Sequence, residues 1–156
     1  MKRIILMIML VTVICSIGLP ASASNYISIE NEPPAIDETF INADGSYYVI
    51  TLTVDETRAS KTGAKTYTYY SSDDVIQWKV RLQGSFTYNG STSTCTNASH
   101  SVTIYNDAWY VYTQNSYKSG NKAIADVTMK KKFLGVVTST RDVHIELACD
   151  KNGNLS

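Results

Sequence analysis

The chain has 156 residues, and its 14 basic and 14 acidic residues leave no net charge at neutral pH. This balance gives no reason to expect nucleic acid or an anionic membrane as a partner, because both are recognised through an excess of lysine and arginine. The length suits one domain and is too short for two domains of ordinary size.

The first 23 residues have the three parts of a secretory signal peptide. Lys2 and Arg3 precede an apolar run over residues 4–19, and residues 21–23 (Ala-Ser-Ala) form a small-x-small cleavage site. The alternative is a membrane anchor, but a spanning helix needs about 20 apolar residues, and this run is shorter and contains Cys15, Ser16 and Gly18. We therefore expect residues 1–23 to be removed, leaving a secreted protein with no membrane span.

Cleavage after Ala23 leaves a mature chain that is organised in two parts. It has 12 basic against 14 acidic residues, since the signal contains two bases and no acid, so its net charge is −2. Residues 24–36 contain Pro33-Pro34 and show little periodicity, which is typical of an extended leader. Residues 37–156 are expected to form a single domain.

Alternation of apolar and polar residues is the strongest structural signal in the chain. From Ile76 to Tyr88 the even positions are apolar or glycine and the odd positions are polar, the pattern of a half-buried strand. The Asn89-Gly90 pair that follows predicts a two-residue hairpin turn and a return strand over residues 91–96. That pairing would set Cys95 opposite Gly84, facing the core.

The same alternation recurs at intervals along the mature chain. It is found in residues 48–54, 65–70, 102–104, 109–113, 123–129 and 143–149, with turn signals at 44–45, 106–107 and 119–121. Eight or nine short strands predict an all-β fold, an antiparallel β-sandwich in the style of immunoglobulin domains, with the strand order left open.

Cys95 and Cys149 are the two cysteines that remain after export, and both fall on the apolar side of their strands. An even number of cysteines in an exported chain predicts a disulfide. Closing a loop of 54 positions would add roughly 4 kcal/mol in the chain-entropy model. The alternative is a pair of buried free thiols, which behave as small hydrophobic groups.

Two polar clusters are candidates for chemistry. His144 alternates with Asp142 and Glu146, so all three side chains share one strand face, where a carboxylate could orient the imidazole as a base in a hydrolase. The alternative is a solvated polar face, and no nucleophile motif accompanies the histidine. Lys130-Lys131-Lys132 is interpreted as protection of an exposed sheet edge rather than as an anion-binding patch. We expect no metal site and no cofactor.

Tyrosine is the most conspicuous residue type, with 11 in the chain. Tyr110 and Tyr112 alternate with Trp109 and Val111, and Tyr67 and Tyr69 lie in a strand that also ends on Tyr70. Because a sandwich strand has only one core face, some of these rings should lie at the surface, where they suit a protein or glycan partner. The alternative is the high β-propensity of tyrosine. Tyr67, Tyr69, Tyr110 and Tyr112 form the predicted binding surface.

Segments in the second half of the chain resemble small exported bacterial proteins of no assigned function. They run from Trp78 to Gly90, include Cys95 and residues 119–123, and end with residues 149–156. This resemblance implies a small β-sandwich and brings no catalytic residues. One tryptophan with two cysteines is also similar to immunoglobulin domains, although here Trp78 precedes both cysteines, whereas in that family it lies between them.

Three functions remain open from the sequence. The first is a secreted, non-catalytic module that binds a protein or glycan through its aromatic surface. The second is a secreted effector, antimicrobial or inhibitor protein, consistent with small size and export. The third is a hydrolase that uses His144 with Glu146 or Asp142.

Overall fold

The computed structural model describes residues 36–57 and 60–156, and these form eight antiparallel strands. The strands are β1 (Ile36–Ile41), β2 (Tyr47–Thr57), β3 (Ser60–Tyr70), β4 (Ile76–Tyr88), β5 (Ser93–Ile104), β6 (Trp109–Ser119), β7 (Lys122–Phe133) and β8 (Val136–Ala148). The predicted signal peptide, and the leader up to Ala35, lie outside the described residues. The described residues contain no helix that is long and apolar enough to cross a membrane.

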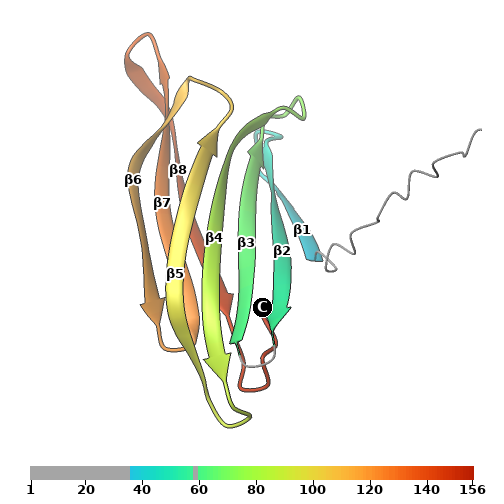
Figure 1. Ribbon diagram of the computed structural model, residues 1–156. Coiled ribbons are helices and arrows are strands. Elements are labelled where there is room, and N and C mark those ends of the chain that lie inside the picture. Colours follow the sequence, from blue (N-terminus) through green and yellow to red (C-terminus); the bar gives the residue numbers. More distant parts are fainter. Residues whose placement is uncertain (1–35, 58–59) are drawn as a thin grey trace, which may run out of the picture. The chain divides into compact units, whose positions relative to one another are not determined.

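The strands are arranged in two sheets, as the sequence predicted for a β-sandwich (Figure 1). One sheet has five strands in the order β1-β2-β3-β4-β5, and the other has three in the order β6-β7-β8. Within each sheet, every strand pairs with the strands next to it in sequence, so both sheets are simple meanders. The strand order, which the sequence left open, therefore differs from the Greek-key connections of immunoglobulin domains.

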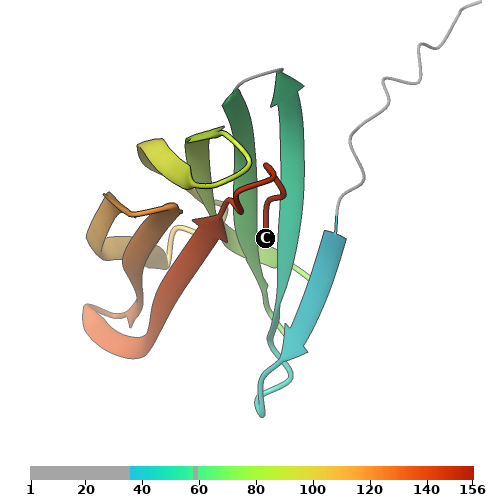
Figure 2. The ribbon, with the colours of Figure 1, turned by 90° about the horizontal axis from the view of Figure 1, so that it is seen from below.

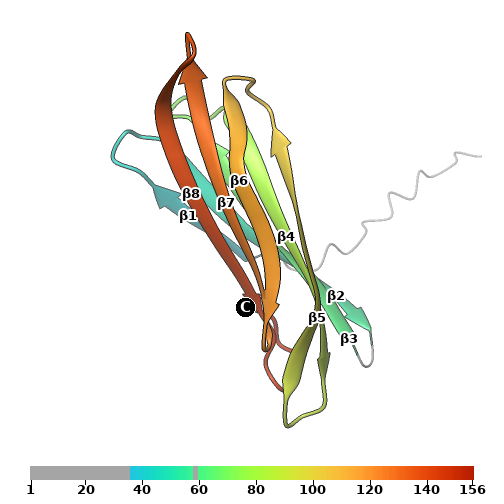
Figure 3. The ribbon, with the colours of Figure 1, turned by 90° about the vertical axis from the view of Figure 1, so that its left-hand side faces the viewer.

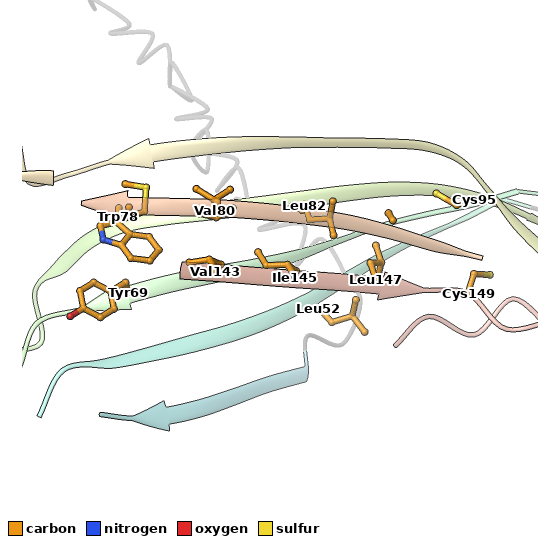
Figure 4. Close-up of a cluster of buried hydrophobic side chains, with 14 of the residues drawn as sticks. Leu52, Tyr69, Trp78, Val80, Leu82, Cys95, Val143, Ile145, Leu147 and Cys149 are labelled. Atoms are coloured by element: carbon orange, nitrogen blue, oxygen red, sulfur yellow. The ribbon is translucent and has the colours of Figure 1, made fainter. Parts of the chain in front are cut away.

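The core lies between the two sheets and is built from the alternating positions that the sequence singled out. Trp78, Val80 and Leu82 of β4 are fully buried against β7 and β8 side chains (Figure 4). From the three-stranded sheet the core receives Ala123, Ala125, Val127, Met129, Val143, Ile145 and Leu147. Strand β4 has the predicted bounds, Ile76–Tyr88.

The return from β4 differs from the predicted two-residue turn. Strand β5 begins at Ser93, which pairs with Tyr88, so the connection has four residues, closed by Asn89 N–H donating to Thr92 O (3.2 Å). The Asn89 side chain accepts backbone bonds from Ser91 and Thr92 (3.0 and 2.9 Å). The longer loop satisfies more backbone donors than a two-residue turn would, and it shifts the register of the strands.

The longer connection, which pairs Tyr88 with Ser93, sets Cys95 opposite Phe86 and not opposite Gly84. A second irregularity follows, because the β4–β5 register changes again between Ser85 and Phe86. A Cβ atom at Gly84 would lie 2.7 Å from Phe86 Cζ and 2.9 Å from Ala123 Cβ. The space above the glycine is therefore filled by a phenylalanine ring and an alanine methyl, and the predicted placement of Cys95 over it is wrong.

The three-stranded sheet covers only part of the larger one. Seen along the strands, the two sheets lie close together at β5 and β6 and diverge toward β8 and β1, with the C-terminal residues between them (Figure 2). Those residues pair with the end of β8: Ala148 and Ser156 exchange backbone hydrogen bonds of 3.0 and 3.1 Å. The inner face of β1, β2 and the adjoining part of β3 is thus left open.

Candidate functional site: the open face of the larger sheet

The open face consists of inward-facing residues of β1–β3 that the smaller sheet does not cover. The strand register aligns Phe40 with Tyr48, Ile50 with Tyr67, and Leu52 with Lys65. In the next strand the same rows reach the buried Trp78, Val80 and Leu82. The face therefore continues the core outward to β1. It consists of Glu38, Phe40, Tyr48, Ile50, Lys65 and Tyr67, and it borders the buried Leu52.

Four rings on this face form a continuous stack, which we call the aromatic ladder: Phe40, Tyr48, Tyr67 and Trp78. Successive ring centroids are 4.8, 4.4 and 5.5 Å apart, with interplanar angles of 13°, 15° and 6°. Trp78 is fully buried, whereas Phe40 on β1 is 42 % exposed. Burial, together with the neighbouring Tyr48 and Tyr69, raises the pKa of Tyr67 well above its usual range.

Below the ladder the open face contains a cavity of about 280 Å³. Its apolar lining comes from Ile50, Leu52 and Leu155, and its polar lining from Glu38, Lys65 and Ser156. Lys65 Nζ donates to the backbone carbonyl of Glu146 in β8 (3.1 Å) and so links the two sheets at this point. The cavity offers an apolar floor with one cationic and one anionic side chain.

Arg141 of β8 lies at the end of the open face that is next to the β1–β2 turn. Its Nη2 atom donates to Asp44 Oδ2 in the β1–β2 turn (2.9 Å), and its guanidinium lies 5.8 Å from the centroid of the Tyr69 ring. Hydrogen bonds from Ser46, together with Arg141, lower the pKa of Asp44. This ion pair ties the edge of the smaller sheet to the turn that carries the ladder strands.

The structure divides the predicted binding surface into two. Tyr67 and Tyr69 belong to the inner face of the larger sheet, and Tyr69, only 5 % exposed, is part of the core. Tyr110 and Tyr112 lie on the smaller sheet, with Lys132 Nζ 4.2 Å from the Tyr110 ring centroid and Lys130 Nζ 3.2 Å from that of Tyr112. The four tyrosines therefore do not form one patch.

The lysine run is not at a sheet edge, so its interpretation as edge protection is wrong. Strand β7 is the central strand of the three-stranded sheet. Lys130 and Lys132 lie over tyrosine rings of β6, and Lys131 lines a second cavity of about 170 Å³ beside Asp44 and Trp109. The tyrosines that contact Lys130 and Lys132 lie on β6. Alternation within a single strand does not reveal which residues of the neighbouring strand lie beside it.

His144, Asp142 and Glu146 share one outward face, as predicted, but the strongest partner of the histidine was missed. His144 Nδ1 lies 2.6 Å from Asp126 Oδ1 of β7, and Nε2 lies 3.3 Å from Glu146 Oε1. Hydrogen bonds to Asp126 and Glu146 raise the pKa of His144. Asp142 instead accepts a hydrogen bond from Thr128 (2.7 Å). With a carboxylate at each ring nitrogen, the protonated form of the imidazole is stabilised, and both nitrogens are already engaged in contacts within the sheet.

The predicted disulfide is not formed, because Cys95 and Cys149 are both buried free thiols. Each sulfur donates to a backbone carbonyl near it in sequence, Cys95 Sγ to Asn97 O (3.2 Å) and Cys149 Sγ to Asp150 O (3.4 Å). Their backbone N–H groups bond to the adjacent carbonyls of Gly120 and Asn121. The inward orientation of both cysteines was predicted correctly, but their sulfur atoms are not joined.

A search of known protein families, of curated proteins and of solved structures found no match to this chain. Among residues 36–57 and 60–156, no group of three or more His, Cys, Asp or Glu side chains is arranged to hold a metal ion. The fold and the open face therefore define an all-β sandwich with one incompletely covered sheet, and any function has to be argued from its own surfaces.

Proposed function

We propose that this chain is an exported, non-catalytic binding module that takes an extended segment of a protein partner along its open face. The observation that carries the proposal is the aromatic ladder, which begins at the buried Trp78 and ends on the half-exposed Phe40 of β1. Leaving such a row of rings uncovered is costly in water, and a partner that covers it recovers that free energy.

The stacking geometry favours a protein segment over a glycan. Sugars bind aromatic residues by lying on a ring face, but in the ladder each internal face is already covered by the next ring at 4.4–5.5 Å. Among the described residues no ring stacks on the outer face of Phe40; apart from this single face, ring edges and hydroxyl groups remain accessible. These match the apolar side chains and polar backbone of a polypeptide.

Strand β1 offers backbone groups with which an extended peptide can pair. In the described residues it pairs with β2 alone, so its other edge presents unpaired N–H and C=O groups over Ile36–Ile41. An extended peptide can add to such an edge as a further strand. Asp37 and Glu38 on β1 favour a partner segment that contains lysine or arginine, and they disfavour self-pairing of two copies through like-charge repulsion.

Export and the absence of catalysis are parts of the same proposal. The signal-peptide pattern of residues 1–23 supports secretion. The contacts of His144 with Asp126 and Glu146 favour an electrostatic role over general-base chemistry, because neither ring nitrogen is free to accept a proton from a nucleophile.

Arrays of immobilised ten-residue peptides and of glycans test the proposal with the purified protein. We expect retention on peptides that combine alternating apolar residues with lysine or arginine, and none on glycans. The F40S variant removes the accessible end of the ladder and should weaken peptide binding at least tenfold, as is typical of an aromatic anchor at an interface.

The Y112S variant is the matched control, because Tyr112 is also an exposed ring (59 %) but lies on the other sheet. It should bind peptides as the wild type does, and both variants should unfold at the wild-type temperature within a few degrees. Glycan binding that depends on Phe40, or equal loss of peptide binding in the two variants, would contradict the proposal.

A further inference from the structure

The hairpin between β7 and β8 ends in a group of exposed apolar side chains. Phe133 is 66 % exposed, Leu134 89 %, Val136 65 % and Val137 44 %. We call these four residues the apolar tip. The hairpin projects beyond the other loops at its end of the sandwich (Figures 1 and 3). No other part of the described chain packs on these side chains sufficiently to bury them, so their contribution to folding is small.

The turn at the apolar tip uses a residue that folding alone disfavours. Leu134 and Gly135 have φ values of 48° and 82°, so two successive residues occupy the left-handed region, as in the tight turns where Asn-Gly is preferred. A leucine in this conformation is strained. Its side chain is nevertheless held out into solvent, which points to a contact made outside the molecule.

A band of lysine and tyrosine lies directly behind the apolar tip. Lys130 and Lys132 precede Phe133 on β7, and their ammonium groups lie over the rings of Tyr112 and Tyr110 on β6. Tyrosine rings with adjacent lysines are the residues that anchor proteins at the boundary between lipid headgroups and acyl chains. One acidic residue, Asp107, lies in the adjacent β5–β6 loop, whose Ala108 carbonyl accepts a bond from Lys132 N–H (2.8 Å).

We propose that the apolar tip inserts into the surface of an anionic lipid bilayer, with Lys130 and Lys132 against the lipid phosphates. Directly behind the apolar side chains at the end of the hairpin come Lys132 and Lys130, whose ammonium groups lie over the rings of Tyr110 and Tyr112 on β6, so apolar groups are followed by cationic groups as acyl chains are followed by phosphates in a bilayer. The absence of excess positive charge in the whole chain does not oppose this contact, since only charges within about a Debye length of the surface contribute. The inference is independent of the peptide-binding proposal, which concerns another sheet.

Flotation with lipid vesicles tests the inference using the purified protein. We expect the wild type to float with vesicles of phosphatidylcholine and phosphatidylglycerol at 3:1, to float less with phosphatidylcholine alone, and to be released as salt is raised. In L134N the side chain at the tip becomes polar while the turn receives a residue suited to positive φ. This variant should fold at least as stably as the wild type and bind anionic vesicles about tenfold more weakly.

Two further variants make the test specific. V75N removes an exposed valine (57 %) from the β3–β4 turn and should bind as the wild type does. K130Q/K132Q should lose the preference for anionic vesicles, at about fivefold per lysine. Failure of the wild type to float with either vesicle, or equal flotation of L134N and the wild type, would overturn the proposal. So would self-association in solution that L134N abolishes without any lipid binding, because a second copy would then be the occupant.

Discussion

At the scale of single residues, sequence alternation predicted which way a side chain points better than it predicted what the side chain contacts. It placed His144 outward with Glu146, and the structure confirms this. It could not identify Asp126 as the closer partner, because that contact depends on the register between β7 and β8. The prediction for Tyr69 was wrong in its direction: the ring was expected at the surface, but it is packed against Trp78 and Trp109 in the core.

The contacts of His144 with two carboxylates make the free energy of unfolding depend on pH. Since hydrogen bonds to Asp126 and Glu146 raise the pKa of His144 above 6.5 in the folded state, its contribution is complete below pH 6.5 and is lost as pH rises through the raised pKa. The imidazole is more than half exposed, so solvent screening keeps the effect to about 0.5 kcal/mol. Urea unfolding of the wild type should therefore give a lower free energy at pH 8.5 than at pH 6, and H144Q should lose most of this difference.

His100 provides the control, because its Nε2 lies beside the neutral amide of Gln114 (3.3 Å). The H100Q variant should keep the pH dependence of the wild type. On the acid side, hydrogen bonds from Lys122 and His144 lower the pKa of Glu146, so its contribution is present above pH 4.5 and is lost as pH falls through the lowered value. If the free energy of unfolding of the wild type rose between pH 6 and 8.5, this would contradict the stabilising role given to the charged His144.

At the scale of elements, the accuracy of prediction followed the strength of the local signal. Strand β4 was predicted to its end residues because thirteen positions alternate without interruption. The hairpin of β7 and β8 was missed over Val136–Arg141, because Leu134-Gly135 is not a typical turn sequence and its flanks are apolar on both sides. Strand β1 was missed for a different reason: six residues with two acids give no clear period.

The irregular pairing of β4 with β5 predicts an unusual response at Gly84. Alanine normally stabilises a strand relative to glycine, by roughly 0.5–1 kcal/mol. Here the added methyl would lie 2.7 Å from Phe86 Cζ and 2.9 Å from Ala123 Cβ, inside a close-packed core. We expect G84A to lower the free energy of unfolding by about 2 kcal/mol, measured by urea titration.

A double-mutant cycle with F86L identifies the cause of this loss. Leucine is shorter than phenylalanine, so the G84A change should cost less in the F86L background than in the wild type. Equal costs in the two backgrounds would mean that the methyl group does not meet the ring, and a stabilised G84A would mean that the register shift between Ser85 and Phe86 is absent.

At the scale of the whole molecule, the decisive feature is the imbalance between five strands and three. Most of the strands can be recognised from their own residues, but the division of a meander into two sheets depends on where the chain bends. The bend between β5 and β6 has no sequence signal beyond an ordinary Asn106-Asp107 turn. The open face follows from this division. The sequence identifies strands that are rich in aromatic residues. Only the structure reveals that Phe40 and Tyr48 extend the stack that Trp78 begins.

The two thiols report on whether the sheets stay together. Cys95 is 3 % exposed on the larger sheet and Cys149 is fully buried after the last strand of the smaller one, and burial raises the pKa of both. A thiol with a raised pKa forms less of the reactive thiolate. Alkylation mapped by mass spectrometry should therefore find both residues unmodified in the native protein at pH 7.5, and modified in urea with the midpoint given by circular dichroism.

The T94C variant supplies an exposed thiol next to Cys95 and should be modified at once without urea. Modification of Cys149 well before Cys95 would mean that the C-terminal residues separate from β8 while the core holds, since Leu155 pairs with Cys149 in an isolated bridge. Simultaneous modification would instead mean that the two sheets part in one cooperative step. We expect the second result, because both cysteines are bonded through their backbone N–H groups to the same β6–β7 turn.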